Sequence, residues 1–542
     1  MPRFTTRLRW ATIVAALAIA VAGCSEAGAP AGGSAGASTG AGQAGTITYQ
    51  LYLQASAFSP FTALTGGDGQ VSLLQFQPLL SVTGDKYVPR VAEKWDVNAD
   101  ATQYTIHLRK ATWSDGKPIT SKDVKYSLEA TADPKTAAVW AGAMTPIKGT
   151  KEFQTGKATT ISGIATPDDR TVVITLTAPH AGFLANLVQV GIVPEHVYGA
   201  IGHDQFKGNE AFHTPKVGSG PYVFSRWIND DTIEFTANPH FWAPVPAAKL
   251  VTKYLTGDAA LAQLQTGEVD IAQLPAAEVE PQKTDGKITV AQGPGSGEMT
   301  LHTALKNGKL ADKRVRQAIL YAIDRDSIVK KVLSGQAKVA DTALFAPDWA
   351  QPSDLVHYGY DPAKAKQLLA AAGWKADTVV RLDINPGQAD RDAVMQIVQG
   401  QLQAVGIKAQ ITPLQPAQVT EVVKNNDFDL MITMLNQVPL IEPAAINVRL
   451  RCDQVAPAGI NITGYCNKQL DDLLDRGMAS TDQTKRAQAY QQANKIINDD
   501  VPILPLYVPT ANYGLNKRIT GFDPTVSPAL MLTSAEQWKI QG

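Results

Sequence analysis

The sequence has almost no net charge with which to attract a polyanion. Its 542 residues carry 49 Lys and Arg against 50 Asp and Glu, a formal net charge of −1. Proteins that bind nucleic acids present a basic face, and no run of Lys or Arg provides one here. The composition therefore gives no support for a nucleic-acid partner, whereas 44% hydrophobic residues is an ordinary balance for a globular protein.

Cysteine and histidine are also scarce, with three Cys and eight His in the chain. His196 and His203 have no Cys, Asp or second His pair at the spacing of metal ligands, so we predict no metal site and no cofactor. A secreted hydrolase would need a nucleophile with a base, or a metal. The segment Gly32 to Gly36 fits G-x-S-x-G, but it lies in a stretch of small residues without the strand and helix that this motif requires. We therefore expect no enzyme.

The apolar run near the amino end is short. It extends over thirteen residues, Trp10 to Ala22, whereas a helix needs about 20 to span a bilayer. Arg3, Arg7 and Arg9 precede it. A positive segment followed by a short apolar one is typical of a secretory signal peptide, so residues 1–23 are predicted to be removed.

The end of this run, Val21-Ala22-Gly23-Cys24, resembles the lipobox of bacterial lipoproteins. That resemblance implies a diacylglycerol on Cys24, which would hold the protein on the outer face of the cell membrane. The alternative is an ordinary signal peptide with an incidental Cys. Residues 24–45 consist largely of Gly, Ala, Ser and Thr, a composition that predicts a flexible tether.

The length of the chain suggests two or more lobes, because single cores stop growing at about 250 to 300 residues. Strand patterns and helix patterns alternate, which indicates an α/β protein. The clearest helix pattern is Asp312 to Leu333, with apolar residues at steps of three and four. Asp312 can cap its first turn, and a second cap near Asp324 to Asp326 would kink it. Its Lys and Arg residues are expected to lie mostly in solvent.

Several short motifs appear in one order along the chain. The most specific reads Trp113-Ser114-Asp115-Gly116, then Asp123-Val124, and the residues in it are structural. The others are Val217 to Tyr222, Asn238 to Trp242, Gly267 to Asp270, Asp361-Pro362 and Tyr465 to Leu474. Taken together, these motifs resemble family 5 extracytoplasmic solute-binding proteins, the dipeptide, oligopeptide and nickel-type receptors of ABC importers.

The resemblance implies a two-lobed periplasmic-binding-protein fold of type II, or cluster C, with an extra subdomain in the first lobe and two crossings between the lobes. The implied division assigns residues 46–80, 219–297 and 507–542 to lobe I, residues 81–218 to the extra subdomain and residues 298–506 to lobe II. Glu298 to Ala304 is expected to be one of the crossing strands.

The resemblance also implies the function. Such receptors capture a solute by hinge closure and deliver it to an ABC permease driven by its ATPase, and they act as monomers. Peptides are the expected solute. An oligosaccharide, a metal chelate or heme bound by the same fold is the alternative, and a secreted hydrolase is the weaker one.

In the first lobe, the resemblance places Gln54, Ala55 and Ser56 at the end of a strand near the ligand. A surface turn is the alternative for these three residues. Tyr507 lies where the family has an aromatic residue in the cleft, with a core tyrosine as the alternative.

In the second lobe, the strand Phe428 to Met434 should end at the cleft, which makes Leu435, Asn436, Gln437 and Glu442 ligand candidates. Peptide receptors of the family place an Asp for the peptide's amino group shortly after this strand. Here the corresponding position is near Pro439. Glu442 could replace the Asp, or it could be a cap or a solvated turn residue. Asn436 and Gln437 could bond amides or sugar hydroxyls.

Cys452 and Cys466 lie fourteen residues apart in an exported chain. Exported proteins meet oxidising conditions, so we predict a disulfide. Closing a loop of this size is worth about 3 kcal/mol in the chain-entropy model. Two free thiols that bind metal or heme are the alternative.

Overall fold

The computed structural model describes residues 45–62, 66–295, 297–343, 347–436, 442–456 and 459–541. The predicted signal peptide, Cys24 and nearly all of the predicted tether lie outside these residues. None of the helices in the described part of the chain has the length and apolar character needed to cross a lipid bilayer.

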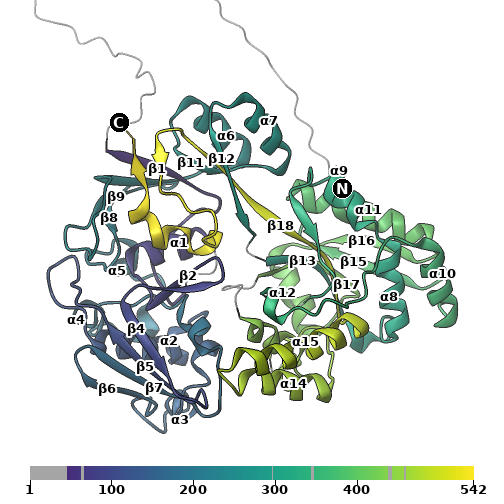
Figure 1. Cartoon of the computed structure of the whole chain (residues 1–542), viewed down its shortest axis with the longest axis horizontal. Coiled ribbons are helices and arrows are strands. Elements are labelled where there is room, and N and C mark those ends of the chain that lie inside the picture. The colour runs from purple at the N-terminus through teal and green to yellow at the C-terminus, as the bar shows by residue number, and fades with distance from the viewer. Residues whose placement is uncertain are drawn as a thin grey trace, which may run out of the picture. The chain divides into compact units, whose positions relative to one another are not determined.

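One mixed sheet of 12 strands runs through the structure (Figure 1). Parallel pairs of strands occur on both sides of β18 in its order, and the pairs that involve β18, together with the last three strands of the order, are antiparallel. In order, its strands are β16 (Lys408–Pro413), β15 (Val379–Ile384), β17 (Leu430–Asn436), β13 (Gly297–Thr303), β18 (Ile503–Leu515), β11 (Ile271–Gln273), β1 (Thr46–Leu51), β10 (Lys249–Tyr254), β9 (Thr232–Ala237) and β8 (Tyr222–Asn229), and β12 (Thr289–Pro294) and β14 (Ala337–Val339) pair with β18.

The buried apolar side chains form separate clusters on the two sides of this sheet order. One large cluster draws on residues 47–271 and 513–540, and another on residues 299–507. We call the parts around them the first and second lobes. Two cores joined by shared strands are the two-lobed α/β fold that the sequence predicts.

Strand β18 joins the lobes. Its first half pairs with β13 and β14, and its second half, from Thr510 onward, pairs with β12. The change of partner falls between Pro509 and Thr510. Because β12 and β13 follow one another in the chain, they form the other crossing, and Figure 1 shows both crossings side by side.

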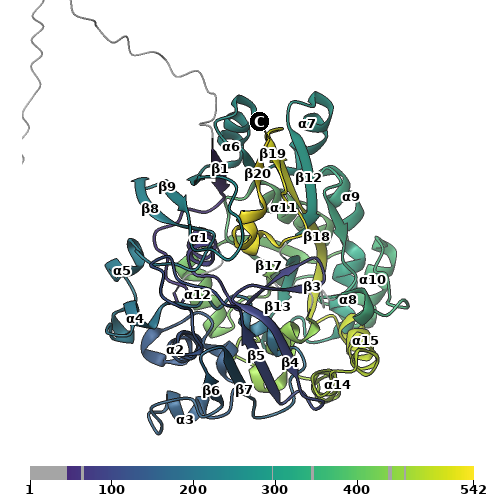
Figure 2. The ribbon, with the colours of Figure 1, turned by 60° about the vertical axis from the view of Figure 1, so that its left-hand side comes forward.

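The first lobe also contains a four-stranded antiparallel sheet, which Figure 2 shows together with α2 and α3. Its helix α2 begins with a capping box between Thr120 and Asp123. The strands are β4 (Ala92–Val97), β5 (Gln103–Leu108), β7 (Thr171–Thr175) and β6 (Ile164–Asp168), with the hairpin β2 (Leu80–Thr83) and β3 (Lys86–Pro89) before them. The helices of this lobe are α1 (Gly67–Gln75), α2 (Ser121–Ala132), α3 (Thr150–Gln154), α4 (Glu195–Tyr198), α5 (Glu210–His213), α6 (Gly257–Thr266) and α7 (Val279–Asp285).

The predicted helix Asp312 to Leu333 is two helices, α8 (Lys313–Ala322) and α9 (Arg325–Lys331). Ile323 between them is extended, and the Asp324 carboxylate accepts from the Ser327 N–H at 2.9 Å to cap α9. The predicted kink is confirmed. The other helices of this lobe are α10 (Pro362–Ala371), α11 (Ala389–Ala404), α12 (Pro416–Asn425), α13 (Asn447–Leu450), α14 (Lys468–Met478) and α15 (Gln483–Asp500).

Arg316 of α8 and Arg325 of α9 do not lie in solvent, which corrects the expectation that the Lys and Arg residues of this segment are exposed. Each is 3% exposed. Arg316 donates to the carbonyls of Leu310 and Val501 at 2.7 and 3.0 Å, and Arg325 donates to the carbonyl of Tyr358 at 2.7 Å. Backbone oxygens thus satisfy guanidinium groups that periodicity alone assigns to the surface.

The carboxyl-terminal segment is fixed to the first lobe by an ion pair. Arg518 donates to both carboxylate oxygens of Asp270, at 2.7 and 2.8 Å. Asp270 is 1% exposed and also accepts from the N–H of Thr48 at 2.9 Å. This pair joins β1, the start of β11 and the segment after β18, all of which border the site described next.

The predicted disulfide between Cys452 and Cys466 is present in the structure. It closes the loop that leads into α14, where Asn467 caps the helix. The structure therefore contradicts the alternative, in which Cys452 and Cys466 are free thiols.

Candidate functional site

In the first lobe, β1 runs parallel to both β10 and β11. In α/β sheets, ligands bind beyond the carboxyl ends of parallel strands, because the loops there leave a crevice. The crossing strand β18 pairs with β11 at Tyr513 to Leu515, and β1 lies on the other side of β11. The crevice expected from the sheet therefore lies beside the crossing.

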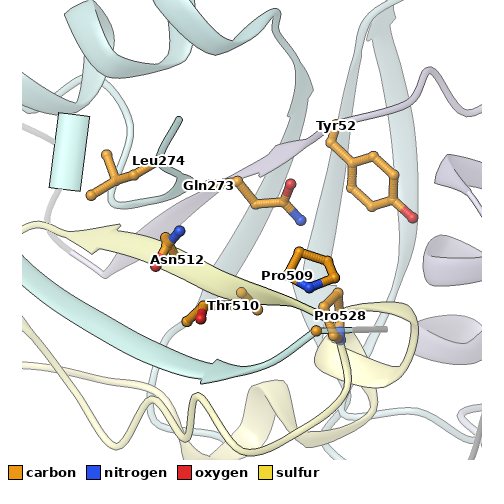
Figure 3. A pocket seen from close by; sticks show the side chains of 9 residues that line it. Tyr52, Gln273, Leu274, Pro509, Thr510, Asn512 and Pro528 are labelled. Carbon is orange, nitrogen blue, oxygen red and sulfur yellow. The ribbon is translucent and has the colours of Figure 1, made fainter. Parts of the chain in front are cut away.

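A cavity of about 210 Å³ occupies this position. Figure 3 shows Tyr52 from the end of β1, Gln273 from β11, and Pro509, Thr510 and Asn512 from β18 around it. Its full lining is Tyr52, Gln273, Leu274, Gly295, Pro509, Thr510, Ala511, Asn512 and Pro528. None of these side chains is charged, so the cavity offers hydroxyl, amide and apolar groups to a ligand.

Tyr52 contributes the aromatic ring of this lining. Burial raises the pKa of its phenol above the ordinary value, so the hydroxyl is neutral near pH 7 and can both donate and accept a hydrogen bond. The side chain of Asn512 is held in place, because its Oδ1 accepts from Gln292 at 2.8 Å. Sequence reasoning missed Tyr52, although an aromatic residue directly after a strand that ends near the ligand was a signal for it.

The three residues predicted just beyond Tyr52 already have partners within the protein. Gln54 donates to Asp231 Oδ1 at 3.0 Å, and Ser56 donates its backbone N–H to Asp68 at 2.5 Å. Ala55 is 4% exposed and belongs to the first lobe's core. The structure thus places these side chains in the turn after β1, and none of them lines the cavity.

In the second lobe, β15 runs parallel to β17 and to β16. The candidate Asn436 is the last residue of β17 and lies opposite Gly297, the first residue of β13. Leu435 is 1% exposed and packs in a core cluster with α14 and α15. Gln437 and Pro439 lie outside the described residues. The carboxyl edge of the second lobe therefore also borders the crossing.

Tyr507 lies on β18 close to this edge, opposite Met299 of β13. It is 3% exposed and belongs to the second lobe's core cluster. Burial, reinforced by the charge of Asp390, raises the pKa of its phenol. In this structure Tyr507 packs among core residues, as the alternative interpretation of that residue proposed.

Arg391 is a charged group at the same edge that sequence reasoning did not single out. It lies in the first turn of α11, and its guanidinium donates to the carbonyl of Asn385, just after β15. Its Nε is buried and, within the described residues, has no hydrogen-bond partner. Burial lowers its pKa, and Asp392 and Tyr507 offset part of that effect. A cation with a free donor thus borders the edge of β15.

Glu442 is buried, at 5% exposure, so the solvated-turn interpretation of this residue is wrong. Its carboxylate accepts from Arg486 at 2.5 Å and from the N–H of Ala444 at 3.3 Å. Arg486 in turn lies 5.3 Å from the ring centre of Trp349. The carboxylate is therefore already paired with a cation of its own lobe.

The pair of Glu442 and Arg486 also touches the first lobe. We call this region the lobe contact, and it consists of residues 180–182 of the first lobe and of Glu442, Met478 and Arg486 of the second lobe. The N–H of Ala181 donates to the carbonyl of Met478 at 2.8 Å. Gly182 lies so close to Glu442 that an added Cβ would come within 2.5 Å of its carboxyl carbon. Burial, with the charge of Arg486, lowers the pKa of His180 to about 4, so this histidine is neutral near pH 7.

Asp383 on β15 is a buried acid, 1% exposed, whose carboxylate has no hydrogen-bond partner among the described residues. Burial raises its pKa to about 6, with Asp429 and Asp427 adding to this and Arg381 opposing it. The folded state then binds the proton more tightly than the unfolded state. The stabilisation that this group contributes to the folded state is therefore fully present below about pH 4 and is lost as the pH rises through about 6.

We accordingly expect Asp383→Asn to raise the free energy of unfolding at pH 7.5 by an amount on the order of 2 kcal/mol, and to give no gain near pH 4. Urea unfolding at the two pH values measures both. Asp377→Asn, at an exposed position, serves as the control. An equal gain at both pH values would contradict the titration of Asp383.

The histidines weighed for a metal are bound to single carboxylates. His196 lies 2.8 Å from Asp115, and His203 lies 2.8 Å from Asp133. Among the residues that the structure describes, no group of three or more His, Cys, Asp or Glu is arranged to hold a metal ion.

Comparison with known proteins agrees with this architecture. The model of the bacterial extracellular solute-binding proteins, family 5, matches residues 86–454. A Brucella ovis protein, described as a candidate peptide-binding protein of an ABC transporter, is 30% identical over 489 residues, which cover 87% of this chain and 88% of the relative.

Solved structures show the same fold. The oligopeptide-binding protein AppA of Bacillus subtilis, in complex with a nonapeptide, aligns with a TM-score of 0.76 at 22% identity, covering 92% of this chain and 99% of AppA. NikZ of Campylobacter jejuni, in complex with Ni(L-His), aligns with a TM-score of 0.77 at 23% identity, covering 91% of this chain and 99% of NikZ. The predicted two-lobed fold and the predicted resemblance are confirmed.

Proposed function

Because this chain belongs to family 5 of the bacterial extracellular solute-binding proteins, we propose that it captures peptides outside the cytoplasm and delivers them to the permease and ATPase of an ABC importer. The observation that carries the proposal is the cavity beside the crossing strands, at the carboxyl ends of β1 and β11. The peptide-binding description of the Brucella relative and the nonapeptide in AppA support peptides as the solute.

The lining of the cavity suits the backbone of a peptide. An extended peptide presents N–H donors and carbonyl acceptors, and its burial costs free energy unless these groups are paired. Tyr52, Gln273, Thr510 and Asn512 supply neutral donors and acceptors of both kinds. Neutral partners bind a backbone without selecting a charged side chain, which fits a receptor for peptides of varied sequence.

Delivery requires that the permease can distinguish the receptor with bound solute from the empty receptor. Two crossings connect the lobes. The crossing strands change their pairing partners near Gly295 and Pro509. The lobe contact is formed in this structure, so rotation near Gly295 and Pro509 would open it to admit a solute and close it again to enclose the solute. Closure would thus present a surface to the permease that the open form lacks.

A lipid anchor at Cys24 is part of the proposal, since an importer receptor works close to its permease. The chain has three cysteines: two are paired in the disulfide, and Cys24 directly follows the signal-like segment. We expect Cys24→Ala to move the exported protein from the membrane fraction to the soluble fraction. Retention of this variant on the membrane would contradict the anchor.

A non-peptide solute is the second candidate. The uncharged lining would also accept the hydroxyls of an oligosaccharide, and NikZ holds a nickel chelate in the same fold. A heme ligand belongs to the same alternative. These solutes are distinguished from peptides by measurement of the unfolding temperature.

The test is a thermal-shift panel of peptides two to nine residues long, oligosaccharides, nickel with L-histidine, and heme. A ligand at a hundred times its Kd stabilises the folded state by about 2.7 kcal/mol, which raises the unfolding temperature by a few degrees. We expect the peptides to give this shift. A shift with a sugar, the nickel chelate or heme, and none with peptides, would favour the second candidate.

A further inference from the structure

The side chain of Gln292 forms two hydrogen bonds that the function as described so far does not use. Gln292 lies on β12, directly opposite Asn512 of β18. Its Nε2 donates to Oδ1 of Asn512 at 2.8 Å and to Oε1 of Gln336 at 2.6 Å. A side-chain amide has two N–H donors, so both donors of Gln292 are engaged.

These bonds join the two lobes beside the cavity. Ala291, the neighbour of Gln292, packs against the first lobe's core, whereas Gln336 lies in the second lobe, between α9 and β14. The carbonyl of Gln336 also accepts from the N–H of Thr510 at 3.0 Å. Thr510 and Asn512 both line the cavity (Figure 3). Gln336 therefore reaches two residues of the proposed solute site, one directly and one through Gln292.

The direction of these bonds is fixed by a backbone carbonyl of the second lobe. An amide oxygen only accepts and an amide nitrogen only donates, so the partners of an amide decide which way it points. Gln336 Nε2 donates to the carbonyl of Ser334 at 3.3 Å, which turns Gln336 Oε1 toward Gln292. Gln292 must then present its nitrogen, and the atom of Asn512 that meets this nitrogen must be the oxygen.

The turn that carries the Ser334 carbonyl is held in one conformation. Ser334 and Gly335 have φ of 50° and 75°, the left-handed region that a residue with a side chain rarely adopts. The N–H of Gly335 donates to the carbonyl of Val329 at 2.9 Å. The N–H of Gln336 donates to the carbonyl of Leu333 at 2.7 Å. These bonds tie the turn to the end of α9 and keep the Ser334 carbonyl beside the amide of Gln336.

The consequence for the cavity is a hydrogen-bond donor of defined position. Because Oδ1 of Asn512 is engaged by Gln292, the polar atom of this side chain that remains for a solute is Nδ2. Asn512 is buried, at 7% exposure, and a buried donor that lacks an acceptor costs free energy. A solute that brings an acceptor oxygen to Nδ2 is therefore favoured over one that brings another donor.

We propose that Gln292 is a positioning residue of the solute site, which turns the Asn512 amide so that its N–H groups receive a backbone carbonyl oxygen of the peptide. This inference rests on the peptide function proposed above and names the group of the peptide that Asn512 recognises. Gln292 is not part of the cavity lining, so it acts through Asn512. Gln336 of the second lobe holds Gln292 in the required orientation.

Two substitutions of Gln292 separate the polarity of this side chain from its presence. Gln292 is exposed, so neither substitution disturbs a core. In Gln292→Glu the side chain only accepts, so Asn512 has to rotate its amide and present Oδ1 to the cavity. In Gln292→Lys the side chain only donates, so the orientation of Asn512 is kept. Gln410→Glu, at an exposed position of β16, is the matched control for the added negative charge.

The probe is the peptide of the thermal-shift panel with the lowest Kd, together with analogues in which one backbone carbonyl at a time is replaced by a thiocarbonyl. Sulfur is a weak acceptor, so each analogue weakens one hydrogen bond to the peptide. Calorimetric titration into the full exported chain gives each Kd. We expect one analogue to bind the wild type about three- to tenfold more weakly than the parent peptide, which is the effect of one neutral hydrogen bond.

Gln292→Glu should bind the parent peptide roughly ten- to a hundredfold more weakly than the wild type does, because Oδ1 of Asn512 then faces the carbonyl oxygen and neither acceptor has a donor. This variant should also bind the parent peptide and the sensitive analogue equally. Gln292→Lys should recover most of the lost affinity and the difference between the two peptides. Gln410→Glu should match the wild type in both respects.

Two results with the variants would overturn the role of Gln292. One is a difference between parent and analogue that persists in Gln292→Glu, and the other is an equal loss of affinity in Gln292→Glu and Gln292→Lys, which would indicate packing instead of polarity. Equal binding of all analogues by the wild type would overturn the donor at Asn512 and leave the peptide function standing, and this comparison needs no variant to fold. If no peptide of the panel binds, the peptide function falls, and this inference falls with it.

Discussion

Replacement of Arg518 by methionine is expected to lower the free energy of unfolding by about 3–5 kcal/mol. The substitution leaves the Asp270 carboxylate 1% exposed without its bidentate partner. An unpaired charge in the interior costs far more than the loss of a surface ion pair, which is worth about 1 kcal/mol or less. Urea unfolding of wild type and variant measures the difference.

Arg476→Met provides the matched control for that substitution. Arg476 is exposed, and its side chain donates to the carbonyl of Asp472 in its own helix, at 3.4 Å. Its replacement should change the free energy of unfolding by less than about 1 kcal/mol. Similar losses for Arg518→Met and Arg476→Met would mean that the pair with Asp270 does not fix the carboxyl-terminal segment.

Gly182→Ala is expected to weaken solute binding by roughly ten- to a hundredfold. The added Cβ would come within 2.5 Å of Glu442 Cδ and 2.8 Å of its Oε1, and Glu442 is held in place by Arg486. The overlap arises where the two lobes touch, so it acts against the closed form. Calorimetric titration with the tightest peptide of the thermal-shift panel measures the change in Kd.

Gly142→Ala is the control for this variant, because Gly142 lies in the same lobe and an added Cβ there meets no atom within 4 Å. It should bind as tightly as the wild type. If Gly182→Ala also bound as tightly, the lobe contact would not form part of the closed, solute-bound state. If Gly182→Ala instead lowered the free energy of unfolding of the ligand-free protein by a large amount, the overlap would destabilise the fold of one lobe and would not act on closure.

Much of the fold could be predicted from the sequence because local signals determine it. The kink at Asp324 followed from an acid placed to cap a second helix. The crossing strand expected at Glu298 to Ala304 is β13, shifted by one residue. In each case the information lies within a few neighbouring residues.

The parts that could not be predicted depend on contacts between distant residues. Periodicity places Arg316 and Arg325 on a polar face, but it cannot show that backbone carbonyls from elsewhere surround their guanidinium groups. The pairing of Glu442 with Arg486 joins residues 44 positions apart in the sequence. Such partners can be identified only from the folded structure, because folding brings distant parts of the chain together.

The candidate site shows the same division. The sequence selected Gln54, Ala55 and Ser56 after the first strand, whereas Tyr52, directly after that strand, lines the cavity. A strand pattern fixes its end to within a few residues, and the direction of each side chain beyond that end depends on the turn. Arg391 carries no local signal at all, because its free Nε follows from burial without a full set of partners.

The central claim, that the two lobes enclose a peptide, is tested most directly by native mass spectrometry of the exported protein purified without denaturation. The account predicts a ladder of bound masses that correspond to short peptides and that disappear on unfolding. Bound masses that match a sugar, a metal chelate or heme, with no peptide among them, would contradict it.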